Sequence, residues 1–235
     1  MRILKSYFFL LLPFFAVIFS CSARIDGVVM AGGSAEINVR ASLGLRTVGL
    51  VQSLRSFMGD TRNTPILDGG AISRSLAAAS GIKSASFKNT SAEALEGTIV
   101  ISNVGDFLLS DKDMFITYSE SSVSSSIVVV LDRNSAPLLI SRLSSEVGEY
   151  LSALMAPVAQ GEYMSSAEYL SLVAMVYGRP LADEIAEARI KASIEFPRPV
   201  TAVSGGSSTG RRAEFDIPLL DIMVLEKPLR YEVKW

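Results

Sequence analysis

The chain has no histidine and a single cysteine, Cys21, among its 235 residues, and these shortages exclude several kinds of site. Without histidine, the protein cannot use a Ser-His-Asp or Cys-His mechanism, and it cannot build a zinc site that contains histidine. One cysteine cannot form an internal disulfide or a four-thiolate metal cluster. The chain has a formal charge of -2 and so lacks the excess of basic residues typical of nucleic-acid-binding proteins. We therefore expect no nucleic-acid partner.

The N-terminal segment has the composition of a processing signal. Arg2 and Lys5 give it a positive start, and residues 7–20 then form an uncharged, largely apolar run. This run is shorter than the ~20 residues that a helix needs to cross a bilayer, and Pro13 interrupts it. We therefore predict a cleaved signal peptide over residues 1–20 rather than a membrane-spanning helix.

Cys21 follows this apolar run directly, with Ile18 three residues before it and Ser20 immediately before it. This arrangement resembles the lipobox of bacterial lipoproteins, although Phe19 is bulkier than the small residue usual at that position. The resemblance implies cleavage before Cys21, attachment of a diacylglycerol to its sulfur, and acylation of its new amino group. An ordinary secretory peptide with an incidental cysteine is the alternative.

Lipidation of Cys21 would determine where the protein resides. Several acyl chains on one residue hold a protein on its membrane, whereas one chain alone binds only reversibly. The partner expected from this resemblance is therefore the membrane itself, contacted through the N-terminal acyl chains. The expected location is the bacterial cell envelope, with the anchored domain facing the periplasm or the cell surface.

Alternation of apolar and polar residues predicts most of the strands. Between residues 35 and 43 every second residue is apolar and the residues between them are polar, as expected of a strand with one buried face. The segment 32–34, Gly-Gly-Ser, is typical of a hairpin turn before this strand. The other predicted strands cover residues 25–31, 83–89, 97–103, 114–120, 125–131, 190–196, 200–203, 213–217 and 229–233.

Apolar residues at spacings of three and four predict the helices. We expect helices over 45–58, 69–80, 136–155, 165–177 and 180–188. Asp68 is placed to cap the second of these, and Ser165 with Glu168 has the spacing of a capping box at the start of the fourth. Residues 136–178 are thus predicted to form a helical hairpin.

Strands that occur in runs, separated by grouped helices, are typical of an α+β fold. We predict a largely antiparallel β-sheet with helices grouped on one face, in a single domain over residues 21–235. The N-terminal strands and the C-terminal strands, about 189–235, are expected to share that sheet.

The C-terminal third has a layout with a known counterpart. An alternating strand ends at Phe196-Pro197, a Ser-Gly turn follows at 204–206, and a second strand contains Phe215. This layout is similar to the C-terminal part of the LppM-like bacterial lipoprotein domain, with Arg198 where that family usually has glycine and Phe215 at its aromatic position. The resemblance implies an envelope lipoprotein with an α+β domain, for which lipid or glycolipid binding is a suggested activity.

Two polar motifs have the composition of binding sites but lack the context that such sites need. The segment 204–212 is rich in glycine and serine and ends in two arginines, yet it precedes a predicted strand, whereas a phosphate loop precedes a helix. We predict a hairpin there. Asp111 and Asp113 offer too few oxygen ligands for calcium. We therefore expect no resident metal and no cofactor.

The helix at 165–177 is apolar on nearly all sides, so it must face protein, lipid or ligand. The simplest interpretation is a helical layer packed on the sheet. A sharper hypothesis is that the helical hairpin and the sheet enclose a cavity for a lipid or other amphiphile, in a non-catalytic protein. Its predicted apolar lining is Leu151, Met155, Tyr169, Val173 and Val176. The alternatives are a lipoprotein that engages an envelope or surface protein, and, more remotely, a hydrolase that works without histidine.

The lipobox resemblance predicts that a Cys21→Ala chain, expressed in bacteria fed a fatty-acid analogue, takes up no label. The label is lost because the acylated sulfur and amino group both belong to Cys21. In-gel detection of the analogue measures this. A Ser22→Ala chain is the control and should label like the wild type, whereas a Cys21→Ala chain labelled at the wild-type level would contradict the prediction.

Overall fold

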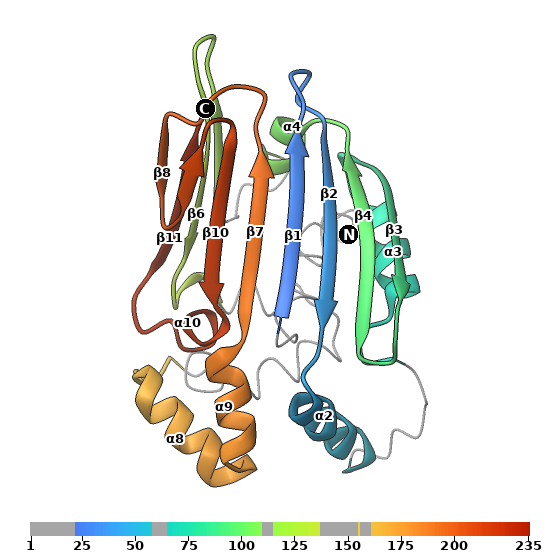
Figure 1. Cartoon of the computed structure of the whole chain (residues 1–235), viewed down its shortest axis with the longest axis vertical. Coiled ribbons are helices and arrows are strands. Elements are labelled where there is room, and N and C mark those ends of the chain that lie inside the picture. Colours follow the sequence, from blue (N-terminus) through green and yellow to red (C-terminus); the bar gives the residue numbers. More distant parts are fainter. Residues whose placement is uncertain (1–21, 58–64, 110–114, 137–154, 156–160) are drawn as a thin grey trace, which may run out of the picture.

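The computed structural model describes residues 22–57, 65–109, 115–136, 155 and 161–235. Within these residues the chain forms two β-sheets, of seven and four strands, and six helices. Figure 1 shows the larger sheet facing the viewer and the smaller sheet beside it. The α+β class predicted from the grouping of strands and helices is confirmed.

The larger sheet joins the start of the described chain to strands from its C-terminal third. All its neighbouring strands are antiparallel except β1 and β7, which run parallel at its centre. The predicted sharing of one sheet by N-terminal and C-terminal strands is confirmed for residues 189–195 and 207–218, and it is wrong for residues 202–204 and 229–234, which belong to the smaller sheet. In spatial order its strands are β3 (Ile82–Asn89), β4 (Ala94–Ile101), β2 (Ala35–Ser42), β1 (Ser22–Val29), β7 (Arg189–Glu195), β10 (Arg212–Pro218) and β9 (Ser207–Thr209).

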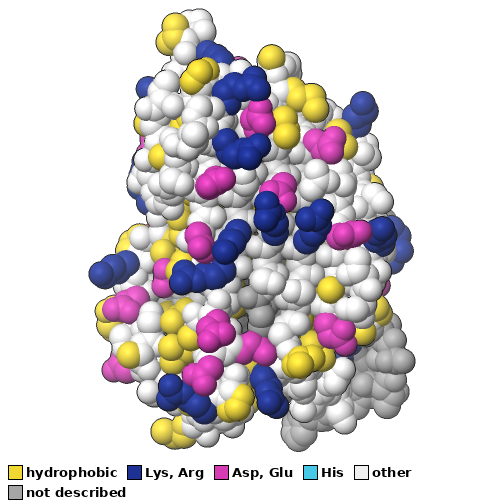
Figure 2. Space-filling view, in the orientation of Figure 1, with side chains coloured by type: hydrophobic (Ala, Val, Ile, Leu, Met, Phe, Trp, Pro, Cys, Tyr) yellow, Lys and Arg dark blue, Asp and Glu magenta, His cyan; other side chains and the backbone are white. Residues whose placement is uncertain are grey.

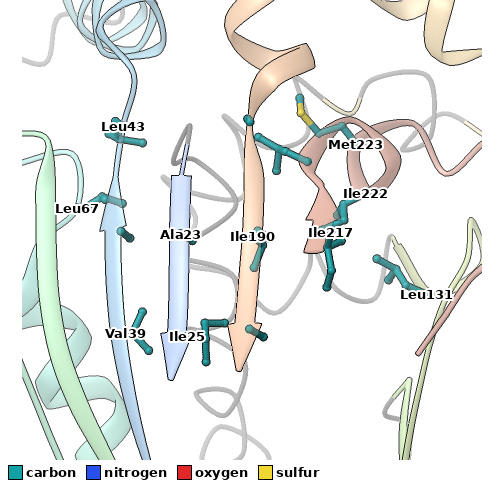
Figure 3. Close-up of a cluster of buried hydrophobic side chains, with 14 of the residues drawn as sticks. Ala23, Ile25, Val39, Leu43, Leu67, Leu131, Ile190, Ile217, Ile222 and Met223 are labelled. Carbon is teal, nitrogen blue, oxygen red and sulfur yellow. The ribbon is translucent and has the colours of Figure 1, made fainter. Parts of the chain in front are cut away.

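The alternation of the sequence gives this sheet one apolar and one polar face. On β2, Ala35, Val39 and Ala41 are buried, while Glu36 and Arg40 are exposed. The polar face carries numerous Lys, Arg, Asp and Glu side chains (Figure 2). The opposite face contributes to the hydrophobic core, where side chains from neighbouring strands lie together (Figure 3).

Four strands predicted within a single sheet form a second, antiparallel sheet instead. Its order is β5 (Ile116–Glu120), β6 (Ser125–Leu131), β11 (Leu229–Lys234) and β8 (Ala202–Ser204). The chain leaves this sheet at β8, turns at Gly205 and Gly206, and enters the larger sheet as β9. Gly205 has a φ of 74°, which glycine adopts without steric cost. This short turn lets consecutive strands belong to different sheets.

The helices lie behind the larger sheet and below its lower end in Figure 1. Helix α3 (Gly69–Ala77) packs on β3, and α4 (Val104–Leu109) packs on β5. The other described helices are α2 (Leu45–Phe57), α8 (Ser166–Tyr177), α9 (Arg179–Glu187) and α10 (Leu219–Val224). None of the helices in the described residues is long and apolar enough to cross a membrane.

Two predicted helix caps are confirmed. Asp68 accepts a hydrogen bond from the amide of Ala71 at 2.9 Å, and Ser165 with Glu168 forms the full capping box at the start of α8. A third cap comes from a distant residue. The carboxylate of Glu184 on α9 accepts hydrogen bonds from the amides of Arg46 and Thr47, at 3.0 and 2.9 Å, at the start of α2. The sequence patterns do not predict this contact between α2 and α9.

The short helices α4 and α10 were not predicted, because six residues show too little periodicity. α10 follows β10 directly, and its residues Leu219, Ile222 and Met223 are buried. The predicted helix over 136–155 lies almost entirely outside the described residues, so the helical hairpin stays a prediction. Helices α8 and α9 do form close to the predicted bounds of 165–177 and 180–188.

Two glycine-to-alanine substitutions should change the unfolding free energy in opposite directions. Gly97 on β4 pairs with Phe87 on β3, and a Cβ at Gly97 would overlap the Phe87 ring and lie 2.6 Å from the carbonyl oxygen of Ser86. Gly97→Ala should therefore destabilise the fold by about 1–3 kcal/mol. Gly49 in α2 has open space around it, so Gly49→Ala should stabilise by about 0.5–1 kcal/mol. Urea unfolding of both variants measures the difference, and a shift in the same direction would contradict the packing described around these two glycines.

Candidate functional site

An apolar cavity of about 240 Å³ lies between the two sheets. The larger sheet contributes residues of β1, β2, β3, β4, β7 and β10, the smaller sheet those of β5, β6 and β11, and α3 and α4 complete the wall. Its lining includes Ile25, Ile37, Val39, Ile99, Ile101, Phe107, Ile116, Ile127, Val129, Ile194, Phe196, Phe215 and Ile217. The strand alternation that buries one face of each sheet thus produces this cavity.

Among the described lining residues, Tyr231 and Glu232 on β11 have polar side chains. Tyr231 stands opposite the lining residue Val129, whereas Glu232 stands opposite Val128 on the other face of the sheet, so the Tyr231 hydroxyl is the polar side-chain group that faces the cavity. Glu232 accepts a hydrogen bond from Nη2 of Arg230 at 2.6 Å, and its side chain is 32% exposed. The Glu232 carboxylate therefore lies on the outer face of the smaller sheet, away from the cavity.

Aromatic rings close the space between the sheets beside β8 and β9. The rings of Phe215 and Tyr231 meet edge to face, with centroids 5.9 Å apart at 88°. Side chains at the Gly205-Gly206 turn would collide with them, because a Cβ on Gly205 would lie 2.6 Å from Tyr231 and one on Gly206 2.6 Å from Phe215. Glycine at both positions lets the turn pack directly on the two rings.

Trp235, the last residue and the single tryptophan of the chain, packs beside the lining residue Phe196. Its ring centroid lies 4.4 Å from that of Phe196, which lines the cavity. Backbone hydrogen bonds of 2.9 Å in both directions join Trp235 to Ser125. Arg198 donates a hydrogen bond to the hydroxyl of Ser125 at 3.1 Å. These contacts join the end of β11 to β6 and to the segment after β7.

The predicted lining residues lie away from this cavity. Met155, Tyr169 and Val173 are buried in the core, and Val176 is 59% exposed on the outer side of α8. None of these four lines the cavity, and Leu151 lies outside the described residues. The alternating strands contained the signal for the actual lining, but their sequence does not say that two separate sheets stand face to face.

Two serine-containing segments, at Ser73 and at residues 206–210, have structural roles. The hydroxyl of Ser73 accepts a hydrogen bond from the amide of Phe87 at 2.7 Å and donates one to the carbonyl of Gly69 at 2.7 Å, which joins α3 to β3. Residues 206–210 have Gly-x-Ser-x-Gly spacing but form β9 and the turn into β10, whereas a nucleophile elbow joins a strand to a helix. Asp111 and Asp113 lie outside the described residues, within which no group of three or more His, Cys, Asp or Glu could hold a metal.

Comparison with known proteins gives one structural likeness. No family model matches the chain, and no curated protein matches it. The chain is similar in structure to the folded domain of the Mycobacterium tuberculosis LppM protein, solved by NMR, with a TM-score of 0.41 and 8% sequence identity. The likeness covers 91% of this chain and 87% of that one.

Burial raises the pKa of Tyr231, and the charge of Asp221 adds to this rise. The folded protein therefore keeps the phenol proton at a pH where the unfolded chain, with a tyrosine pKa of about 10, loses it. The stability that this proton contributes is complete below pH ~10 and is lost as the pH rises through the folded pKa. We predict that the unfolding free energy falls above pH ~10 and that Tyr231→Phe makes this fall smaller.

Urea unfolding over a series of alkaline pH values measures this effect. Tyr163→Phe is the control, because it makes the same chemical change at a side chain that is 70% exposed, and Tyr231→Phe should reduce the alkaline fall more than this control does. An equal dependence in wild type and Tyr231→Phe would show that water reaches the Tyr231 hydroxyl as freely in the folded chain as in the unfolded one.

Proposed function

We propose that this chain is a bacterial envelope lipoprotein, held on its membrane through Cys21, which binds the apolar part of an amphiphile without catalysing a reaction. The observation that carries the binding proposal is the cavity between the sheets, whose lining is almost entirely aliphatic and aromatic. The cavity lies between the sheets, a position different from the space between helical hairpin and sheet expected from the sequence. Apolar surface is the chemistry that an acyl chain or a hydrocarbon ring recognises.

The volume of the cavity limits the size of the ligand. About 240 Å³ exceeds the ~150 Å³ of an engineered apolar cavity that holds benzene. It is smaller than the ~300–1,000 Å³ of pockets that take drug-sized molecules. The proposed ligand therefore inserts a stretch of one acyl chain or one compact apolar group, and the rest of the amphiphile remains outside.

The polar edge of the cavity gives the bound molecule an orientation. The hydroxyl of Tyr231 lies there, and the other described side chains that face the cavity have no hydrogen-bonding group. A polar head buried among aliphatic side chains would lose its hydrogen bonds to water. We therefore place the head of the amphiphile beside Tyr231 and its apolar part toward Ile99 on the larger sheet.

A second candidate function is docking of an envelope protein on α8. Tyr169 and Val173 of this helix are buried, but Leu172, Met175 and Val176 are exposed, Met175 to 82%. Three exposed apolar side chains on one helix are costly in water and are typical of interaction surfaces. Substitutions can separate this proposal from the cavity proposal, because no residue of α8 lines the cavity.

Titration calorimetry of residues 22–235 with dodecanoate tests the cavity proposal. We expect binding with a negative heat-capacity change, the mark of apolar burial. Val129→Trp, which places a large ring in the cavity, should weaken the affinity at least about tenfold, or ~1.4 kcal/mol.

The matched control is Val128→Trp on the same strand, because successive side chains of a strand point to opposite faces and Val128 is not a lining residue. Its affinity for dodecanoate should stay within about twofold of the wild type. Equal weakening by both substitutions, or no dodecanoate binding at all, would contradict the proposal. Loss of a protein partner in Met175→Glu with unchanged dodecanoate binding would instead support docking on α8.

A further inference from the structure

The register of the larger sheet places three cations side by side on its polar face. Arg24 on β1 stands directly opposite Arg40 on β2 and, on its other side, directly opposite Lys191 on β7. Like charges in directly opposed positions destabilise a sheet. The three strands nevertheless keep this arrangement at the centre of the sheet, where the polar face of the molecule shows a belt of basic side chains (Figure 2).

These three cations and Arg189 border a groove of about 350 Å³ on the polar face. Glu96 is the single acidic residue among its described lining residues. The groove is open to solvent, because Arg24, Arg40, Arg189 and Lys191 are all exposed. Its other lining residues are Ser22, Ala23, Ala41, Ser42, Thr90, Ala94 and Leu95.

The acids around the groove compensate only part of this positive charge. Arg24 pairs with Asp26 at 2.9 Å. Glu96 is shared, since it lies 3.1 Å from Nζ of Lys88 and 3.9 Å from Nε of Arg40.

Beside β10 the compensation is weaker still. Lys191 stands opposite Asp216 in the register but forms no ion pair with any described residue. Burial raises the pKa of the Asp221 carboxyl, and the positive charge of Arg189 opposes that rise. The excess charge therefore lies on Arg40 and Lys191, on the two sides of Arg24.

We propose that this groove binds a phosphate group and that its source is the anionic headgroup of a lipid in the membrane to which the chain is attached. Arginine guanidinium groups match phosphate oxygens through paired hydrogen bonds, and lysine adds a point charge. Ser22, which lines the groove, is the residue next to Cys21. Acyl chains on Cys21 would thus hold the groove at the headgroup layer. The lipid source rests on the proposed attachment through Cys21, whereas the phosphate site itself does not.

Titration calorimetry tests this site with the full chain in uncharged dodecyl maltoside micelles at low salt. The probes are dihexanoyl phosphatidylglycerol and glycerol 1-phosphate, which carry the phosphate with and without acyl chains. The test variant is Arg40→Gln with Lys191→Gln. Each cation near an anionic surface changes affinity about fivefold, so the double variant should bind both probes roughly 25-fold more weakly.

Two controls distinguish binding in the groove from a general effect of positive charge and from binding in the cavity. Arg212→Gln removes one positive charge from the far end of the same sheet, outside the groove, and should leave the affinity unchanged. Val129→Trp fills the cavity on the opposite face and should not alter glycerol 1-phosphate binding. If Val129→Trp binds dodecanoate as tightly as the wild type while the groove behaves as expected, the cavity proposal fails and the phosphate site stands.

Binding that weakens with added salt is a second measurement, because exposed charges are screened at high ionic strength. Tighter binding of the lipid than of glycerol 1-phosphate supports the headgroup as the source, and equal binding of the two overturns that source in favour of soluble phosphate compounds. The site itself is overturned if the double variant binds both probes like the wild type, if Arg212→Gln weakens binding equally, or if neither probe binds. Urea unfolding confirms that the double variant is folded; if it is not, Lys191→Gln alone replaces it, with about a fivefold loss expected.

Discussion

The parallel pairing of β1 with β7 is the constraint on which the rest of this structure depends. It joins Ser22, the first described residue, to Arg189, which follows all the described helices except α10. Closing so long a loop costs conformational entropy that grows with loop length. Burial of Ile25 and Ile190 on the inner face of the paired strands opposes that cost. The other strands of the larger sheet lie on both sides of this pair.

The same pairing determines what each face of the sheet contains. Side chains alternate across a strand, so a register that turns Ile25 inward must turn Arg24 outward. The inner face then meets the smaller sheet and leaves an apolar cavity, while the outer face aligns Arg24 with Arg40 and Lys191. The apolar cavity and the basic groove are two consequences of one register, and a slip by one residue would abolish both.

The sequence predicted the individual elements better than their assembly. Alternation located β2 and β7, and Asp68, Ser165 and Glu168 identified two helix starts, because these signals act between residues close in the chain. Six-residue helices such as α4 were not predicted, because so few residues show no clear periodicity of apolar side chains. The candidate site was expected beside α8, because apolar residues on all sides of a helix indicate burial without naming the surface that buries them.

What the sequence by itself determined is local: which segments form strands, which face of each strand is apolar, and where a lone cysteine ends an apolar N-terminal run. Tertiary structure alone decided that the strands divide between two sheets, that a cavity remains between them, and that Arg24, Arg40 and Lys191 become neighbours. The physical reason is the register between strands distant in sequence. Periodicity specifies the face on which a side chain lies, but only pairing specifies which other side chains lie beside it.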